Sequence, residues 1–209
     1  MRYFFLFLLG IVNGLFISPI SPKNVNQMKY WDALQSDITK TVIAEGPTKT
    51  GKSLIVVSYA LEKFLNNKFN TIIVTCPYET FYLDREMFYS CGLSPQELQE
   101  YKDIQCMRID KLRKLTPKTL IIAEHMEHST KHQMYKLLMS LERNCKIVIT
   151  GNLNDTEEKQ NGLSYLINRV KEEKPNCFDV IQMNHADYVG NGEEEELFKI
   201  SVVKLFERS

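Results

Sequence analysis

The residues with the clearest chemical signature lie in one short segment. GPTKTGKS, at residues 46–53, places Gly46, Gly51, Lys52 and Ser53 at the four defined positions of the pattern GxxxxGK[ST]. Glycines let the backbone curl so that its N–H groups point inward, and a helix that begins at the end of such a loop presents its positive end to the same anion. The segment therefore predicts a phosphate-binding P-loop of the Walker A type.

Each residue of this loop is assigned a role toward a bound nucleotide. Lys52 would reach the β and γ phosphates, and the Ser53 hydroxyl would bind Mg²⁺. The alternative, a turn that carries a solvated lysine, is disfavoured because a strand-like run precedes the loop and an amphipathic helical pattern follows it. We expect the phosphates of a bound nucleotide to be surrounded by Gly46, Pro47, Thr48, Lys49, Thr50, Gly51, Lys52 and Ser53.

An acidic residue on a second strand must complete the metal site, and Glu124 follows the strand-like run TLIIA at 119–123. In such sites an aspartate commonly holds Mg²⁺ through a water, and a neighbouring glutamate positions the attacking water. Glu124 is one methylene longer than aspartate and still reaches a hydrated metal. His125, in the glutamate's place, has two open interpretations: a catalytic base, or a packed imidazole that replaced a lost acid. The predicted catalytic set is Lys52, Glu124 and His125.

A transition-metal site is the competing interpretation of the same acidic and histidine residues. His128 and His132 are four residues apart on a predicted helix, although the pattern is not HExxH. No cysteine lies at a matching spacing, so a dedicated transition-metal site is disfavoured. The residues concerned are Glu124, His125, Glu127, His128 and His132.

Strand-like and helical patterns alternate along the chain. Such alternation is typical of βαβ units, and it predicts one α/β domain with a mainly parallel sheet flanked by helices. Residues 78–103 and 152–161 are expected to be loops or inserts. The apolar runs lie at 41–44, 71–75, 119–123 and 146–150, with a weaker run at 104–109, and the helical patterns lie at 53–65, 130–141 and 163–173.

Composition limits the classes of function. The 209 residues suit one domain, and 26 basic residues balance 26 acidic ones, so no global basic field indicates a nucleic-acid partner. Five cysteines without a CxxC pair indicate reduced, mostly buried thiols.

The N-terminal segment, residues 1–20, is apolar after Arg2 and is predicted to be a secretory signal or organelle-targeting sequence, with no stable membrane span in the mature chain. An edge strand or short buried helix in an otherwise cytoplasmic protein is the alternative. The unpatterned cysteines argue against export through an oxidising compartment.

Several short motifs occur in the order found in one family of ATPases. They are SPKNVNQMKYWDAL at 21–34, the P-loop, TLIIAEHMEHSTKHQM at 119–134, KIVITGN at 146–152 and DVIQMNHADYV at 179–189. In this order the chain resembles the PhoH-like proteins, P-loop ATPases related to the cores of superfamily-one helicases. The resemblance implies a RecA/helicase-like P-loop NTPase domain over residues 21–209, with ATP and Mg²⁺ as cofactors. It also implies that Gln27 contacts the adenine edge, that RNA is a candidate partner and that homo-oligomers form.

The chain departs from the family pattern mainly at positions that do chemistry. Lys49 replaces a small glycine, and Asn152 replaces the aspartate that senses the γ-phosphate. Asn184 and Cys76 each stand where the family has an arginine. Binding is therefore the firm expectation, because loss of such groups lowers turnover far more than affinity. Two functions follow: a slow or specialised ATPase linked to RNA, or a catalytically impaired nucleotide-binding module that acts through a protein partner. A small-molecule kinase is disfavoured because no arginine-rich lid is evident.

Overall fold

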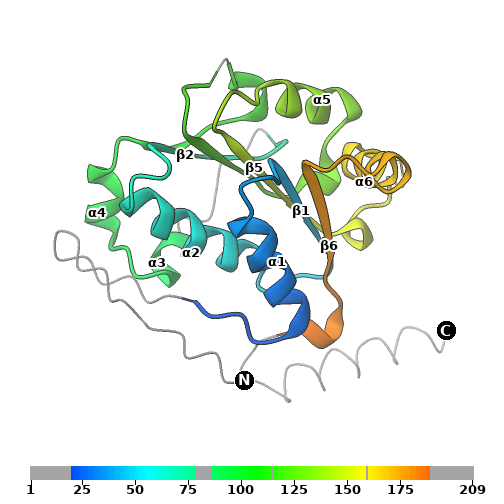
Figure 1. Ribbon diagram of the computed structural model, residues 1–209, viewed down its shortest axis with the longest axis horizontal. Helices are drawn as coiled ribbons and strands as arrows, with labels where there is room; N and C mark the ends of the chain where they lie inside the picture. Colours follow the sequence, from blue (N-terminus) through cyan, green and yellow to red (C-terminus); the bar gives the residue numbers. More distant parts are fainter. Residues whose placement is uncertain (1–19, 79–85, 114, 159, 189–209) are drawn as a thin grey trace.

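A six-stranded sheet organises the residues that the computed structural model describes, namely 20–78, 86–113, 115–158 and 160–188. All its strand pairs are parallel, in the order β3-β2-β4-β5-β1-β6 (Figure 1). The expected α/β class with a parallel sheet is confirmed. The strands are β1 (Thr41–Glu45), β2 (Thr71–Thr75), β3 (Ile104–Cys106), β4 (Thr119–Ala123), β5 (Lys146–Gly151) and β6 (Phe178–Gln182).

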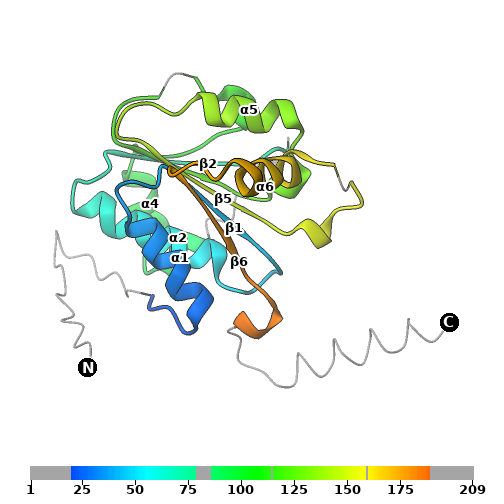
Figure 2. The same ribbon diagram turned by 45° about the vertical axis from the view of Figure 1, so that its right-hand side comes forward.

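Helices cover both faces of this sheet. Figure 2 shows α1 and α2 on one side and α5 and α6 on the other. Four 3-10 turns, η1 (Ile109–Lys111), η2 (Met126–His128), η3 (Leu153–Asp155) and η4 (His185–Asp187), complete the regular elements of the described residues. The α-helices are α1 (Val25–Gln35), α2 (Lys52–Leu65), α3 (Glu86–Ser90), α4 (Pro95–Glu100), α5 (Lys131–Met139) and α6 (Gly162–Glu173).

The strands bury side chains on both faces, which produces two separate cores. Val42 and Ala44 of β1 pack with α1 and α2, whereas Ile43 between them packs with α5 and α6. Successive side chains of a strand point to opposite faces, so one strand supplies both cores. A parallel sheet that is covered on both sides needs nearly continuous apolar strands, and this is why the runs at 71–75 and 119–123 mark β2 and β4 to the residue.

The strand order brings three segments to one edge of the sheet. β5 lies between β1 and β4, with Ala44 opposite Thr150 and Ala123 opposite Ile149. The loop that follows β1, the acid that follows β4 and the turn that follows β5 therefore meet at the carboxyl edge, where open α/β sheets bind their ligands.

Four regular elements are absent from the sequence-based prediction. α1 and β6 lie in segments that were assigned only through family motifs, and α3 and α4 lie in the region expected to be loop. The weaker run at 104–109 forms a strand only to Cys106, because the chain then turns into η1.

Residues 1–19 of the apolar N-terminal segment lie outside the described residues, so the targeting prediction is untested. Within the described ranges, no helix has the length and apolar character needed to cross a membrane.

A buried lysine lies at the amino-terminal edge of the sheet, opposite the edge that holds the phosphate loop. Lys146, at the start of β5, is 5% exposed, and its Nζ donates to the carbonyl oxygens of Leu34 at 2.6 Å, Ser36 at 2.8 Å and Ala33 at 3.3 Å. These carbonyls belong to the end of α1, whose last C=O groups have no partner within the helix. Burial lowers the pKa of Lys146 to about 8, with nearby Lys68 as a second cause.

This lowered pKa predicts a stability that rises with pH. Between the folded pKa and the higher unfolded value the unfolded chain binds more protons, so the free energy of unfolding increases with pH. Compared with Lys146→Met, the wild-type protein should gain about 2 kcal/mol between about pH 8 and about pH 10. Urea unfolding of both proteins measures the difference, and tyrosine ionisation cancels between them. A difference that stays flat or falls would contradict the prediction.

Candidate nucleotide-binding site

The predicted phosphate loop lies between β1 and α2 and is fixed to both neighbouring strands. The Gly46 N–H donates to the Gly151 carbonyl at 3.1 Å, and the Met183 N–H donates to the Glu45 carbonyl at 2.7 Å. Gly46 has φ +145°, and a Cβ placed on it would lie 2.3 Å from the Met183 carbonyl oxygen. Only glycine fits this position, because both the dihedral angle and the neighbouring backbone exclude a side chain.

Lys52 places its charge at the centre of the loop. Its Nζ donates to the carbonyl oxygens of Gly46 at 2.6 Å and Pro47 at 2.5 Å, and the side chain is 8% exposed. Burial lowers the pKa of Lys52, and the nearby carboxylates, Glu124 first, oppose that shift. The structure thus places the amine inside the predicted phosphate loop, and its contact with a bound phosphate stays a prediction.

The tip of the loop differs in character from its base. Thr48 and Lys49 are exposed, whereas Thr50 is buried and its Oγ1 donates to the Pro47 carbonyl at 2.9 Å. Lys49 has φ +63°, in the left-handed region. A glycine adopts this conformation without strain, which accounts for the small glycine that this position has in the resembling family.

Glu124 joins the loop to the centre of the sheet. Its Oε2 accepts a hydrogen bond from the Ser53 hydroxyl at 2.8 Å and a second one from the Thr150 hydroxyl. The structure therefore brings together the two predicted metal ligands, Ser53 and Glu124. Burial raises the pKa of Glu124, while the two hydroxyls and the charges of His125 and Lys52 counter that rise.

The second carboxylate oxygen of Glu124, Oε1, has no hydrogen-bond partner. It is buried, and Glu124 as a whole is only 3% exposed. Buried acceptors are nearly always satisfied, so an unsatisfied one at a site calls for an explanation such as water or an ion. A hydrated Mg²⁺ fits this donor set, because the hydroxyl of Ser53 and the carboxylate of Glu124 are oxygen ligands of the kind that Mg²⁺ prefers.

His125 follows directly after Glu124, and its side chain is exposed. It has φ +56°, and its side chain is 61% exposed, so it is not the packed imidazole of the second sequence interpretation. Its Nδ1 lies 3.6 Å from Oε1 of Glu127, a residue to which the sequence analysis gave no catalytic or nucleotide-binding role. Glu127 is 3% exposed, and its spacing three residues after Glu124 was the only signal that pointed to it.

Gln27 lies behind the loop and contacts it directly. Its Nε2 donates to the Thr50 carbonyl at 3.0 Å and to the Asp187 carbonyl at 3.3 Å, and its Oε1 accepts from the Lys23 N–H at 2.7 Å. The side chain is 3% exposed. Gln27 therefore connects α1, the phosphate loop and η4, and contact with an adenine edge stays a prediction.

Asn152 and Asn184 stand where the resembling family has its γ-phosphate-sensing aspartate and an arginine, and in this structure both have local structural roles. Asn152 caps η3 through a hydrogen bond from the Asn154 N–H to its side chain at 3.2 Å. Asn184 caps η4 by accepting from the Ala186 N–H at 2.9 Å. Asparagine suits such caps because its side-chain oxygen satisfies a free N–H.

The alternative metal interpretation fails on geometry. His128 ends η2 and His132 belongs to α5, so the two histidines do not share one helix. Among the described residues, no group of three or more histidine, cysteine, aspartate or glutamate side chains could hold a metal ion.

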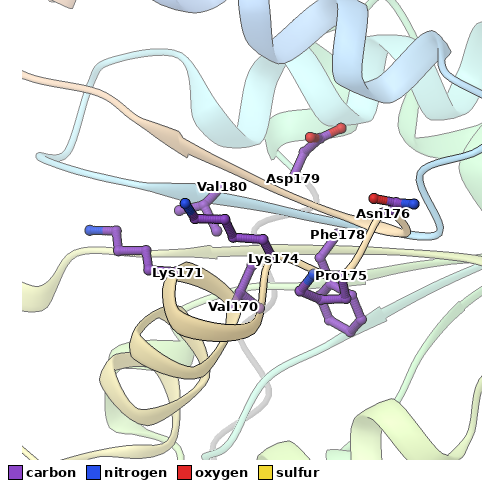
Figure 3. A pocket seen from close by; sticks show the side chains of 8 residues that line it. All are labelled: Val170, Lys171, Lys174, Pro175, Asn176, Phe178, Asp179 and Val180. Atoms are coloured by element: carbon purple, nitrogen blue, oxygen red, sulfur yellow. The ribbon is translucent and has the colours of Figure 1, made fainter.

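A shallow groove between α6 and β6 (Figure 3) contains none of the predicted site residues; it is lined by Val170, Lys171, Lys174, Pro175, Asn176, Phe178, Asp179 and Val180.

The packing of Gly46 gives a test of the loop's attachment. Gly46→Ala should destabilise the protein by about 3 kcal/mol or more, because it adds a backbone clash to an unfavourable φ. Gly92→Ala is the matched control: Gly92 also has a positive φ, of 101°, but is exposed. Chemical denaturation of both variants measures the difference, and equal losses of stability would show that the contact with Met183 does not matter.

Comparisons with known proteins agree with this geometry. Residues 19–109 match the family model described as PhoH-like protein, a range that contains Gln27 and the whole phosphate loop. The resemblance drawn from those motifs is confirmed there. No curated protein matches the chain. The family match and the site together support a nucleotide-binding function of the ATPase type.

Two solved structures share the fold at low sequence identity. The Sulfolobus solfataricus SWI2/SNF2 ATPase core in complex with dsDNA aligns with a TM-score of 0.52 and 12% identity, over 80% of this chain and 47% of that one. The large terminase of bacteriophage HK97 aligns with a TM-score of 0.50 and 16% identity, over 78% of this chain and 40% of that one. This chain thus spans less than half the length of either structure, and the likeness concerns the fold alone, which is that of the P-loop ATPases.

Proposed function

We propose that this chain, which matches the PhoH-like family model over residues 19–109 and has the fold of the P-loop ATPases, binds Mg²⁺-ATP and hydrolyses it slowly. The observation that carries the proposal is the 2.8 Å hydrogen bond from the Ser53 hydroxyl to Glu124, beside the amine of Lys52. The hydrogen bond joins the phosphate loop after β1 to the acid after β4 at the carboxyl edge of the sheet, where open α/β sheets bind their ligands.

The loop residues give each part of the substrate a partner. Backbone N–H groups of the loop and the positive end of α2 attract the phosphates, and Lys52 exchanges the carbonyls of Gly46 and Pro47 for phosphate oxygens. Ser53 and Glu124 would hold Mg²⁺, which supplies charge neutralisation for the β and γ phosphates.

Slow chemistry follows from the group at position 125. In the hydrolysis, the oxygen of a water forms a bond to the γ-phosphorus, the bond from phosphorus to the bridging oxygen breaks, and that oxygen leaves with ADP. The proton of the attacking water goes to His125, whose exposed imidazole takes the place of the family's glutamate. A nucleotide-binding module without turnover is the second candidate, and the use of Asn152 and Asn184 as turn caps favours it.

RNA is proposed as the effector, and two exposed tyrosines support this proposal. α5 and α6 expose Tyr135 (62%) and Tyr165 (48%), and Lys131 Nζ lies 4.7 Å from the Tyr165 ring centroid. Exposed aromatic rings next to lysines suit stacked bases and backbone phosphates of single strands. Homo-oligomerisation and targeting by residues 1–20 remain proposals drawn from the sequence alone.

Removal of the loop lysine separates the two candidates. Lys52→Ala should weaken ATP binding by about tenfold to 100-fold, because a charged hydrogen-bond donor is lost. ATP affinity and steady-state hydrolysis should be measured on both proteins, with and without single-stranded RNA. A wild-type rate that exceeds the Lys52→Ala rate supports the ATPase, whereas background rates for both, with ATP binding lost only in the variant, support the binding module.

Restoring the family's acid at position 125 tests the origin of the slow rate. His125→Glu should raise kcat by about tenfold or more, since a carboxylate positions the attacking water more effectively here. ATP affinity should stay within about twofold because this side chain lies outside the phosphate loop. Single-turnover hydrolysis measures the step directly. An unchanged rate would mean that position 125 does not limit the chemistry.

A further inference from the structure

Glu127 is a buried carboxylate, next to the site, that the roles assigned so far leave unused. It is 3% exposed, and its Oε2 accepts from the Asn152 N–H at 3.2 Å. A Cβ placed on Gly151 would lie 2.7 Å from the same oxygen. The missing side chain at position 151 therefore makes room for the carboxylate against the backbone that leaves β5.

Two imidazoles converge on the other oxygen of Glu127. His125 Nδ1 lies 3.6 Å and His128 Nε2 lies 3.5 Å from Oε1, within the range of an ion pair and long for a hydrogen bond. Burial favours the neutral acid, but the nearby His125 imidazole and the backbone N–H groups of Glu127 itself and of Asn152 outweigh it and lower the pKa of Glu127. The carboxylate is thus an anion held between the end of β4 and the end of β5.

The two histidines are not equivalent. His128 is one-third exposed and packs on the Tyr78 ring, with centroids 5.0 Å apart, so aromatic contact also fixes its position. His125 is 61% exposed, its ring centroid lies farther from Tyr78, at 6.3 Å, and it follows directly after Glu124. The Tyr78 ring thus lies closer to His128 than to His125, whereas Glu127 lies at nearly the same distance from both.

We propose that Glu127 is the positioning residue of His125 and orients its imidazole for the hydrolysis proposed above. The inference rests on that proposed function. A carboxylate that faces Nδ1 favours the tautomer with the proton on Nδ1, which leaves the lone pair on Nε2 at the other edge of the ring, and the same pairing holds the ring in one orientation. Glu127 thus keeps a carboxylate near position 125, where the family has a glutamate, but this carboxylate acts through His125.

The kinetic test replaces the charge and keeps the shape. Glu127→Gln should lower kcat by about 10- to 100-fold and leave the KM for ATP within about twofold, as expected when a partner that orients a reacting group is lost. In a His125→Ala background the same change should have no further effect on kcat, because both residues act as one unit. Glu172→Gln is the matched control: it makes the same chemical change on α6, where Glu172 is exposed and pairs with Arg169. Equal effects of Glu127→Gln in both backgrounds, or an unchanged kcat, would overturn the proposal.

A spectroscopic test does not depend on turnover. ¹⁵N NMR of the imidazoles in the full chain should show the neutral His125 ring protonated at Nδ1 in the wild type, and a shift toward the Nε2-protonated tautomer in Glu127→Gln. An unchanged tautomer in the variant would refute the orientation by Glu127. Background ATPase activity in the wild type, combined with the predicted tautomer shift, would refute hydrolysis and leave the pairing of Glu127 with His125 established.

Discussion

The hydrogen bonds that converge on Glu124 are the interaction on which the rest of the site depends. Ser53 lies in the first turn of α2, and Thr150 is the next-to-last residue of β5, the strand between β1 and β4; both side chains donate to Glu124. One carboxylate oxygen thus ties together α2, β4 and β5 at the carboxyl edge of the sheet. The other oxygen is buried without a partner, and leaving such a group unsatisfied costs about 1–3 kcal/mol. A protein tolerates that cost at a site that a cation or its water completes.

Around this point, the structure separates binding from chemistry. Gly46, in the predicted phosphate loop, donates to the Gly151 carbonyl at the end of β5, and Lys52 donates to the carbonyls of Gly46 and Pro47 within the loop. The positions that should accelerate hydrolysis carry residues suited to turns: His125 has a left-handed backbone, and Asn152 and Asn184 cap short 3-10 turns. Such replacements preserve the fold of the edge while removing charge from it. This arrangement supports the proposal that the protein hydrolyses ATP slowly.

The sequence predicted those parts whose local pattern has a single structural meaning. The phosphate loop was predicted because GxxxxGK[ST] specifies both glycine dihedrals and charge, and β2 and β4 because strands buried on both faces must be apolar throughout. β6 was missed because it is a half-buried edge strand with a charged residue, Asp179, in its middle. α4 was missed although Ser94 and Glu97 form a capping box, since its short length leaves no apolar period to recognise. Glu127 was missed as a part of the site because only the folded chain brings its carboxylate against Gly151 and Asn152 at the end of β5.

The Mg²⁺ dependence of ATP affinity tests the central claim most directly. Calorimetric titration of the wild-type protein with ATP should give a dissociation constant below about 1 mM in Mg²⁺, and a clearly weaker one when the metal is chelated. Ser53→Ala should lose most of this dependence and retain the metal-free affinity, because the loop and Lys52 remain. Binding that is indifferent to Mg²⁺, or no binding of ATP at millimolar concentration, would contradict a site built around Ser53 and Glu124.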